Sequence, residues 1–201
     1  MSDKRRPYKM KARAEQEAQT RLRITESAVE LHGSLGPART SMKAIAEHAG
    51  VPRSTVYRHF PDEEAVFGAC SAHWSAEHPP PDLGRWEQIA DPEERLRVAL
   101  ADLYDYYQGA APMLDKLLRD EGAVPVVGRL MQAFHQLFPA VTEILMRGRG
   151  LRGRARDRTR AAIAHAVAFR TWQQLTEEQG LDAEQAIDLM RRLVAAASER
   201  R

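Results

Sequence analysis

Side chains that could contact DNA are concentrated between Thr40 and Phe60, in the stretch TSMKAIAEHAGVPRSTVYRHF. Its second half presents guanidinium, hydroxyl, phenol and imidazole groups close together: Arg53, Ser54, Thr55, Tyr57, Arg58 and His59. Guanidinium groups donate to the edge of guanine, threonine methyl groups contact thymine methyls, and hydroxyl and basic groups hold phosphates. Folding alone requires no such set, so we expect this surface to bind nucleic acid.

A glycine turn between two short helices is predicted to display these side chains. Gly50 can adopt the positive φ that a steep turn between helices needs, because it has no Cβ. The apolar residues before the turn fall at helical spacing on one face: Met42, Ile45, Ala46 and Ala49. After the turn, Pro52 suits the first turn of a helix, and Val56 and Phe60 are expected to point into the core. The polar set then faces outward.

The first of these two helices is predicted to begin after Thr40 and Ser41, which are favourable N-cap residues. The free N–H groups at the start of a helix also bind phosphate. The two hydroxyl groups are therefore candidates both for capping the helix and for contacting the DNA backbone.

The residues YRHF, followed by PDEEAVF at positions 61–67, resemble the DNA-binding domain of the TetR family of transcriptional repressors. The resemblance covers about residues 15–67 and includes a preceding helix with an apolar stripe formed by Ile24, Ala28, Leu31 and Leu35. It implies that base edges are read by Lys43, Arg53, Ser54, Thr55 and Arg58. It implies phosphate contacts by Thr40, Ser41, Tyr57 and His59.

One position departs from the family pattern. Family members often carry a lysine at the start of the next helix, where this chain has Glu63. A carboxylate repels phosphate, so we expect this backbone contact to be absent or to be supplied by the N-terminal arm. Glu63 and Glu64 still favour a helix start through the helix dipole.

Charge is distributed unevenly along the 201 residues. Residues 1–60 carry 12 Lys and Arg against 6 Asp and Glu, a net charge of +6, whereas the remaining residues carry 18 against 22, a net charge of −4. Basic charge gathered in one part of a protein steers that part toward a polyanion. Residues 1–14 form a basic arm that we expect to be flexible. Two interpretations stay open: the arm contacts phosphates or the minor groove, or it is a disordered tail.

Helical spacing continues through the rest of the chain, and no stretch alternates like a strand, which predicts an all-α fold. We expect a helix-turn-helix domain over residues 15–61 and a larger helical domain over residues 62–201. Prolines predict breaks in the larger domain at residues 78–84 and at Ala111–Pro112, the second before a short helix that ends at Asp120. A long apolar stripe follows from about Val124 to Leu145.

Two amphipathic helices are predicted near the end of the chain, over about residues 155–178 and 183–199. In the TetR family the last two long helices pair with their copies in a four-helix dimer interface, and the stretch from His165 to Val194 resembles that region. A homodimer would match the two-fold symmetry of a pseudopalindromic operator in double-stranded DNA. The pattern also fits helices that only close the core of one monomer.

The resemblance further implies a cavity among the central helices that binds a small apolar effector and moves the two DNA-reading domains apart. The candidate effector contacts are Trp86, Tyr104, Tyr107, Met113, Phe134, His135, Phe138, His165, Phe169 and Trp172. Aromatic residues at helical spacing also pack in cores, and a lone histidine on an apolar face is usually satisfied internally. Core packing is therefore the alternative for each of these residues.

Patterns of enzymes and metal sites are weak in this chain. The residues GRGLRG at 148–153 match the GxGxxG dinucleotide pattern, but a helical stripe and not a strand precedes them. We interpret Arg147–Arg160 as an exposed, flexible connection. His73 and His78 have a poor metal spacing, and the single Cys70 supplies neither a disulfide nor a zinc cluster. We expect no catalytic residue, no metal ligand and no cofactor.

The sequence therefore predicts a ligand-responsive repressor that binds its operator as a dimer and is released by a small apolar molecule. The alternative is a helical ligand-binding or partner-binding protein whose first domain binds DNA only nonspecifically. No signal peptide or apolar stretch of membrane length is present, which predicts a cytoplasmic protein without a membrane partner.

Overall fold

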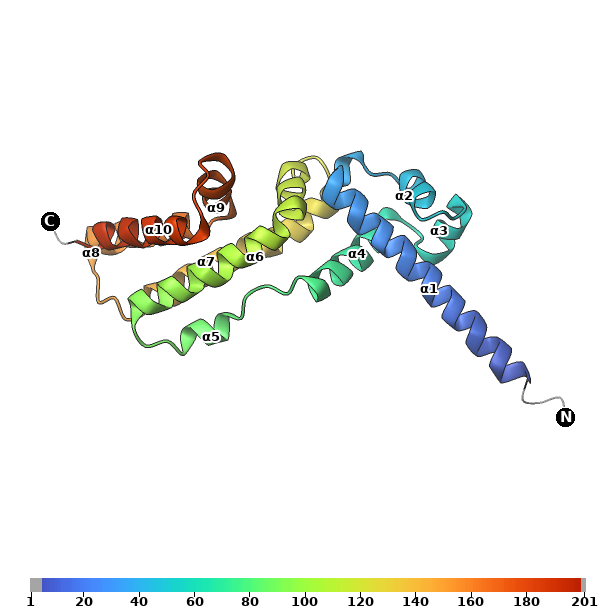
Figure 1. Cartoon of the computed structure of the whole chain (residues 1–201), viewed down its shortest axis with the longest axis horizontal. Helices are drawn as coiled ribbons and strands as arrows, with labels where there is room; N and C mark the ends of the chain where they lie inside the picture. The colour runs from blue at the N-terminus through green and yellow to red at the C-terminus, as the bar shows by residue number, and fades with distance from the viewer. Residues whose placement is uncertain (1–4, 200–201) are drawn as a thin grey trace. The chain divides into compact units, whose positions relative to one another are not determined.

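Every regular element of the computed structural model is helical; the structure describes residues 5–199, with side chains for residues 10–199 (Figure 1). The elements in chain order are α1 (Arg5–Ser34), the 3₁₀ turn η1 (Pro37–Arg39), α2 (Met42–His48), α3 (Arg53–His59), α4 (Glu63–Glu77), α5 (Leu83–Glu87), α6 (Pro92–Asp120), α7 (Pro125–Met146), α8 (Gly153–Ala166), α9 (Phe169–Gln173), the π-helical turn η2 (Gln174–Glu178) and α10 (Ala183–Ser198). Residues 5–199 contain no strand, so the predicted all-α fold is confirmed.

The chain divides into two compact units. Unit 1 contains the chain up to Glu77 together with Pro112–Arg129, and unit 2 contains His78–Ala111 and the chain from Leu130 onward. The helices α6 and α7 each contribute to both units. The units are defined by their internal contacts, so the expected domain division between residues 61 and 62 stays a prediction.

A small apolar core in unit 1 is shared by α1, α2, α3 and α4. Val56 and Phe60 are fully buried, at 0% exposure, together with Ile24 and Ala28 of α1. The predicted inner face before the turn is also buried, and consists of Met42, Ile45, Ala46 and Ala49. Helices as short as the seven residues of α2 and of α3 are marginal alone. Their order therefore depends on this shared core.

The turn between α2 and α3 is built on Gly50, as predicted. Its φ is +62°, a conformation that residues with a Cβ rarely adopt. Its N–H donates to the carbonyl oxygen of Glu47 at 3.2 Å, and the N–H of Val51 donates to that of Ala46 at 3.0 Å. A Cβ added to Gly50 would meet no atom within 4 Å. The requirement for glycine therefore comes from backbone conformation and not from space.

The N-terminal end of α1 differs from the expected flexible arm. The helix begins at Arg5, so residues 5–14 are helical. Residues 1–4 and the side chains of residues 5–9 lie outside the part of the chain that the structure describes.

The C-terminal end of α1 also corrects the sequence analysis. Leu35 was expected to complete a buried stripe but is 44% exposed, because the helix stops at Ser34. The N–H groups of Leu35 and Gly36 both donate to the carbonyl oxygen of Leu31, at 2.9 and 3.2 Å, and Gly36 has a φ of +93°. A glycine with positive φ just after a helix is a common way to end it.

Helix α6 is continuous through Pro112, where the sequence analysis placed a break. Proline removes one backbone hydrogen bond and crowds the preceding turn. Pro112 itself is exposed, but its apolar neighbours on both sides are buried: Ala110, Ala111, Met113 and Leu114. Burial of these neighbours outweighs the local cost of the proline, so the expected separate short helix before Asp120 is wrong.

The single helix expected over residues 155–178 is interrupted after α8. The hydroxyl of Tyr104 donates to the carbonyl oxygen of Ala166 at 2.9 Å, and that of Tyr107 donates to the carbonyl oxygen of Val167 at 2.7 Å. The two carbonyl groups thus accept hydrogen bonds from side chains instead of from the N–H groups of a further helical turn. The chain is extended at Ala168, and α9 begins after it.

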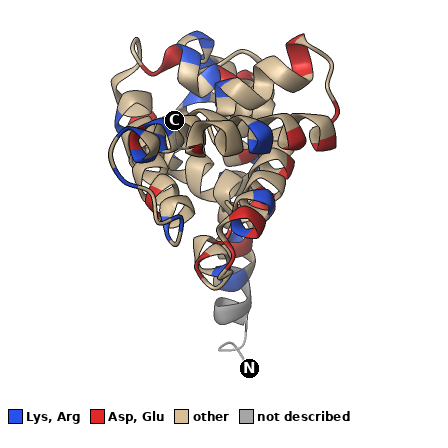
Figure 2. Cartoon of the chain, turned by 90° about the vertical axis from the view of Figure 1, so that its left-hand side faces the viewer, with Lys and Arg blue, Asp and Glu red and all other residues tan. Residues whose placement is uncertain are grey.

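The arginine-rich stretch Arg147–Arg160 is mostly exposed, as expected, but it is not only a connection between helices. Helix α8 takes in its second half. The side chain of Arg149 is 4% exposed and donates to Glu93 at 2.5 Å, and Arg160 is paired with Glu143. Basic and acidic segments are interspersed along the ribbon in Figure 2, an arrangement that permits such pairs.

Replacing Gly50 with alanine is expected to lower the free energy of unfolding by about 1–2 kcal/mol, because the alanine Cβ lies too close to a backbone carbonyl oxygen in the left-handed conformation. Gly68 is the matched control: it lies within α4, and a Cβ there would also meet no atom within 4 Å. Gly68→Ala should raise stability by about 0.5–1 kcal/mol, since alanine is favoured inside helices. Urea denaturation of the two variants measures both values. Equal effects of the two substitutions would contradict the role assigned to Gly50.

Candidate nucleic-acid interface

The predicted DNA contacts lie on α2, on α3 and on the residues just before α2. Ser41 is the N-cap of α2, and its hydroxyl accepts a hydrogen bond from the N–H of Ala44 at 3.2 Å. The predicted contacts with exposed side chains are Ser41, Lys43, Arg53, Ser54, Tyr57 and Arg58. The predicted contacts that are partly buried are Thr40, Thr55 and His59. The structure therefore brings all nine residues onto one short segment of unit 1, while their roles stay predictions.

Two of the predicted contacts are associated with each other on the outer face of α3. Arg53 donates from Nη2 to the hydroxyl of Tyr57 at 3.0 Å, and its guanidinium carbon lies 5.3 Å from the centroid of the tyrosine ring. On α2, Lys43 forms an ion pair with Glu47 at 3.6 Å. Surface pairs of this kind contribute little to stability, so all three polar tips can be redirected toward a ligand at small cost.

The C-terminal end of α3 is held by an arginine that the sequence analysis did not identify. Arg21 of α1 donates from Nη1 to the carbonyl oxygen of His59 at 2.6 Å, and its guanidinium carbon lies 4.1 Å from the centroid of the Phe60 ring. A cation at this end of a helix is favoured by the helix dipole. The two residues are 38 positions apart, so no local sequence pattern indicates the contact.

A groove beside the end of α3 extends the polar surface onto α1. It has a volume of about 300 Å³ and is lined by Arg13, Gln16, Glu17, Thr20, Arg58 and His59. Nε2 of His59 is buried and has no hydrogen-bond partner within the described chain. Exposed polar residues of α1 therefore lie next to two of the predicted DNA contacts.

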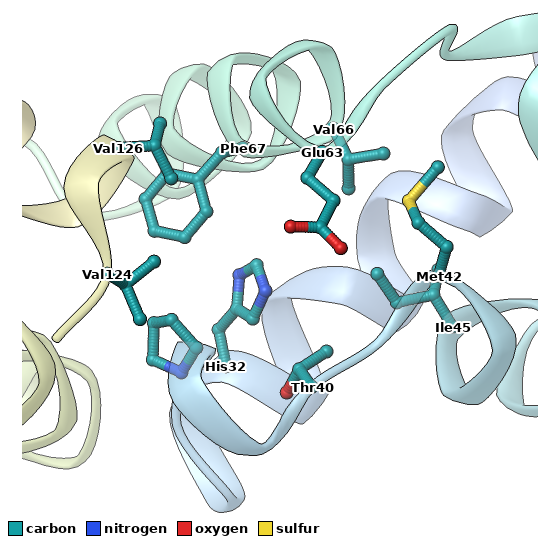
Figure 3. A pocket seen from close by; sticks show the side chains of 10 residues that line it. His32, Thr40, Met42, Ile45, Glu63, Val66, Phe67, Val124 and Val126 are labelled. Atoms are coloured by element: carbon teal, nitrogen blue, oxygen red, sulfur yellow. The ribbon is translucent and has the colours of Figure 1, made fainter.

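Glu63, the departure from the family pattern, is exposed at the start of α4. Asp62 caps this helix by accepting the N–H of Ala65 at 2.8 Å. Figure 3 shows the carboxylate of Glu63 directed into a small pocket, on the side of His32. The pocket has a volume of about 30 Å³ and lies next to the start of α2, where Thr40 and Met42 line it.

His32 and Cys70 form a buried polar contact behind this pocket. Nδ1 of His32 lies 3.3 Å from Sγ of Cys70, and the imidazole packs against the Phe67 ring with centroids 4.9 Å apart. Burial lowers the pKa of His32 to about 4 and raises the pKa of Cys70 to about 12. Both groups are therefore neutral near pH 7, and the protonated thiol is a poor nucleophile.

Comparison with known proteins agrees with this geometry. Residues 24–70, which run from the last third of α1 to the middle of α4, match the sequence model of the family described as bacterial regulatory proteins, tetR family. This N-terminal domain belongs to the TetR family. No curated protein sequence matches the chain.

Solved structures with the TetR fold cover nearly the whole chain. A TetR-like transcriptional regulator from Rhodococcus sp. RHA1 is 19% identical, with a TM-score of 0.64 over 90% of this chain and 97% of that one. A Clostridium perfringens protein described as a fatty acid metabolism regulator is 15% identical, with a TM-score of 0.63; the match covers 89% of this chain and 100% of that one. The multidrug binding protein EbrR, solved with imidazole, is 20% identical, with a TM-score of 0.52; the match covers 86% of this chain and 93% of that one. The chain thus has the fold of TetR-family transcriptional regulators.

The effector candidates suggested by the TetR resemblance fall into separate groups. One group in unit 2 is an aromatic cluster: the Tyr107 centroid is 5.4 Å from that of Phe169 and 6.0 Å from that of Trp172. Tyr104 lies beside this cluster, at 6.4 Å from Tyr107. A second group lies on α7 and is partly or fully exposed: Phe134, His135 and Phe138.

The remaining effector candidates are dispersed. Trp86 is fully buried and donates from Nε1 to Asp102 at 2.8 Å. His165 is exposed, with Nδ1 at 3.3 Å from the hydroxyl of Thr171. Met113 belongs to unit 1. Burial raises the pKa of Tyr104 and of Tyr107, which keeps both hydroxyl groups protonated as donors.

Other chemistry is not indicated in the described part of the TetR-like chain. The GxGxxG residues 148–153 follow helix α7 and not a strand, so they lack the setting of a dinucleotide turn. Across residues 5–199, no group of three or more His, Cys, Asp or Glu side chains could hold a metal ion. None of the helices described here is both long enough and apolar enough to cross a membrane.

The pH dependence of stability tests the state of His32. Its pKa is about 4 in the folded protein and about 6.5 when unfolded, so the unfolded chain binds more protons between these values. The free energy of unfolding is therefore unaffected by His32 above about pH 6.5. It falls by up to about 3 kcal/mol as the pH drops from 6.5 toward 4, because the buried imidazole must then become protonated.

Urea denaturation at pH 7 and pH 5 measures this loss. The variant His32→Gln should show a flatter pH dependence than the wild type. His48→Gln, which replaces an exposed histidine of the same unit, should keep the wild-type slope. Identical slopes for the wild type and His32→Gln would show that His32 does not carry the effect.

Proposed function

We propose that this protein is a transcriptional repressor that binds a pseudopalindromic DNA operator as a dimer and leaves it when a small apolar molecule binds. The observation that carries the proposal is the outer face of α3. Val56 and Phe60 are fully buried, so the side chains of Arg53, Ser54 and Arg58 are turned outward. A helix with this composition on its exposed face suits direct readout of the major groove.

The charge distribution supports DNA as the partner. Residues 1–60 have a net charge of +6, and the rest of the chain has a net charge of −4. The basic excess thus lies in the part that contains α2 and α3, where it attracts phosphates. This role places the protein in the cytoplasm with its operator.

The last two long helices support a homodimer. Within unit 2, α8 and α10 are connected by a contact of 3.1 Å between the hydroxyls of Thr159 and Ser198. On the outer side of α10, Leu189 and Leu193 are 43% and 41% exposed and lie one helical turn apart. A second copy of the chain would cover this apolar stripe and supply the two-fold symmetry that a pseudopalindromic operator requires.

The effector is proposed to be small and apolar, with the aromatic cluster of Tyr107, Phe169 and Trp172 as its candidate contact. Among proteins of the same fold, one is described as a regulator of fatty acid metabolism and another as multidrug binding. Release from DNA follows if the effector binds the non-reading arrangement of the dimer more tightly than the reading arrangement.

Selection of bound duplexes from a random DNA pool by the purified protein tests specific reading. We expect an enriched inverted repeat. On that site, Arg53→Ala or Arg58→Ala should weaken binding by about 1 to 3 kcal/mol and relax the preference for particular bases. Ser41→Ala, which alters a predicted phosphate contact, should weaken binding similarly on all sequences.

Salt-sensitive binding without an enriched motif, and with no change of preference in the arginine variants, would favour the alternative of a helical binding protein with nonspecific DNA affinity.

The dimer surface is tested by Leu193→Glu, which places a charge within the exposed stripe of α10. We expect the mass in solution to fall from that of a dimer to that of a monomer, because a carboxylate is costly to bury without a partner. Leu137→Glu is the matched control, since Leu137 on α7 is 46% exposed and lies outside this stripe. Light scattering measures both masses. A dimeric Leu193→Glu variant would place the interface elsewhere.

A further inference from the structure

The connection between α1 and α2 is held by the end of a helix more than eighty residues further along the chain. Asp120 is the last residue of α6, and its Oδ2 accepts a hydrogen bond from the N–H of Ala38 at 2.9 Å. Its neighbour Arg119 donates from Nη2 to the carbonyl oxygen of Leu35 at 2.9 Å. Two adjacent side chains thus bind two backbone groups of one short turn within unit 1.

The fit between this turn and the two side chains is tight. A Cβ on Gly36 would lie 2.1 Å from Nη2 of Arg119 and 2.6 Å from Oδ2 of Asp120. Gly36 also has a φ of +93°. The turn therefore needs glycine both for its backbone conformation and for the close approach of these side chains.

Asp120 lies at a position that is electrostatically unfavourable for a carboxylate. Its side chain is buried, at 6% exposure, and it lies at the C-terminal end of α6, where the helix dipole disfavours an anion. Hydrogen bonds from Arg119 hold the pKa of the carboxyl below its usual value against the opposing effect of burial, and the Ala38 N–H acts in the same direction. The hydrogen bonds from Arg119 and from the Ala38 N–H offset the cost of burying the carboxylate, and they hold the carboxylate against the turn.

The turn that Asp120 binds leads directly into the start of α2. The hydroxyl of Thr40 donates to the carbonyl oxygen of Gly36 at 2.9 Å, and its N–H donates to that of Pro37 at 3.1 Å. Ser41 follows as the N-cap of α2. Any displacement of the turn therefore moves the two hydroxyl groups that are predicted to contact DNA phosphates.

We infer that Asp120, supported by Arg119, is a positioning residue for DNA binding: it fixes the turn at residues 35–39 so that Thr40, Ser41 and the start of α2 meet the phosphate backbone. This inference rests on the proposed DNA-binding function and adds to it a residue outside the helix-turn-helix segment. Asp120 itself touches no DNA in this arrangement; it acts through the turn.

The first test measures DNA affinity by fluorescence anisotropy. Asp120→Asn keeps the size of the side chain but removes its charge, and should weaken binding by about tenfold, as expected when a charge-assisted hydrogen bond is lost. Asp105→Asn makes the same charge change on an exposed residue of the same helix and should leave affinity within about twofold. Unchanged affinity of Asp120→Asn would overturn the inference.

A double-mutant cycle separates positioning from general loss of stability. If Asp120 acts by placing the phosphate contacts, its substitution should cost less when Ser41→Ala is already present, whereas it should cost the full amount beside Arg58→Ala. Full additivity with both partners would overturn the inference. Arg119→Ala leaves Asp120 in place and should give a smaller loss of DNA affinity, with the same dependence on Ser41→Ala and Arg58→Ala. This variant replaces Asp120→Asn in the cycle if Asp120→Asn does not fold.

Amide hydrogen exchange provides a readout that needs no DNA. The N–H of Ala38 should exchange at least about tenfold faster in Asp120→Asn, while the N–H groups in the middle of α4 keep their wild-type rates. Wild-type exchange at Ala38 would overturn the inference.

The affinity test also works on a duplex of unrelated sequence, because phosphate contacts are independent of sequence. Failure to enrich an operator would therefore refute the proposed specific function without deciding the role of Asp120.

Discussion

Burial of the inner face of α3 is the constraint on which the candidate interface depends. Val56 and Phe60 are one helical turn apart and are both fully buried against Ile24 and Ala28 of α1. In a helix with 3.6 residues per turn, anchoring these two positions fixes the direction of every other side chain. The basic and hydroxyl groups of α3 are thus turned outward by an apolar contact in which they take no part.

Besides apolar packing, the structure adds a polar contact at each end of the pair of seven-residue helices α2 and α3. Arg21 binds the carbonyl oxygen of His59 at the end of α3, and Asp120 binds the N–H of Ala38 just before α2. Each side chain comes from outside the helix-turn-helix and satisfies a backbone group of the segment. The candidate interface on α2 and α3 therefore depends on contacts from α1 and from the end of α6, and is not an independent motif.

The features that could be predicted from the sequence are those determined by neighbouring residues. Gly50, the buried pair Val56 and Phe60, and the all-helical fold follow from local spacing, and the family resemblance agrees with them. The errors arose where distant contacts decide the outcome. Pro112 stays inside α6 because buried neighbours outweigh its local cost, and the helix expected over residues 155–178 is interrupted beside hydroxyl groups that lie about sixty residues earlier. The contacts made by Arg21 and Asp120 are of the same long-range kind.

The proposed effector site is the part that sequence spacing predicts least, because periodicity indicates which side chains are buried and not whether space remains between them. In the structure, the hydroxyls of Tyr104 and Tyr107 are committed to the carbonyl oxygens of Ala166 and Val167. A ligand that displaced either hydroxyl would leave a buried carbonyl without a donor, at a cost of about 1–3 kcal/mol. An apolar molecule cannot replace that donor. The geometry therefore favours an effector that contacts the apolar ring faces of the cluster and leaves both tyrosine hydrogen bonds intact.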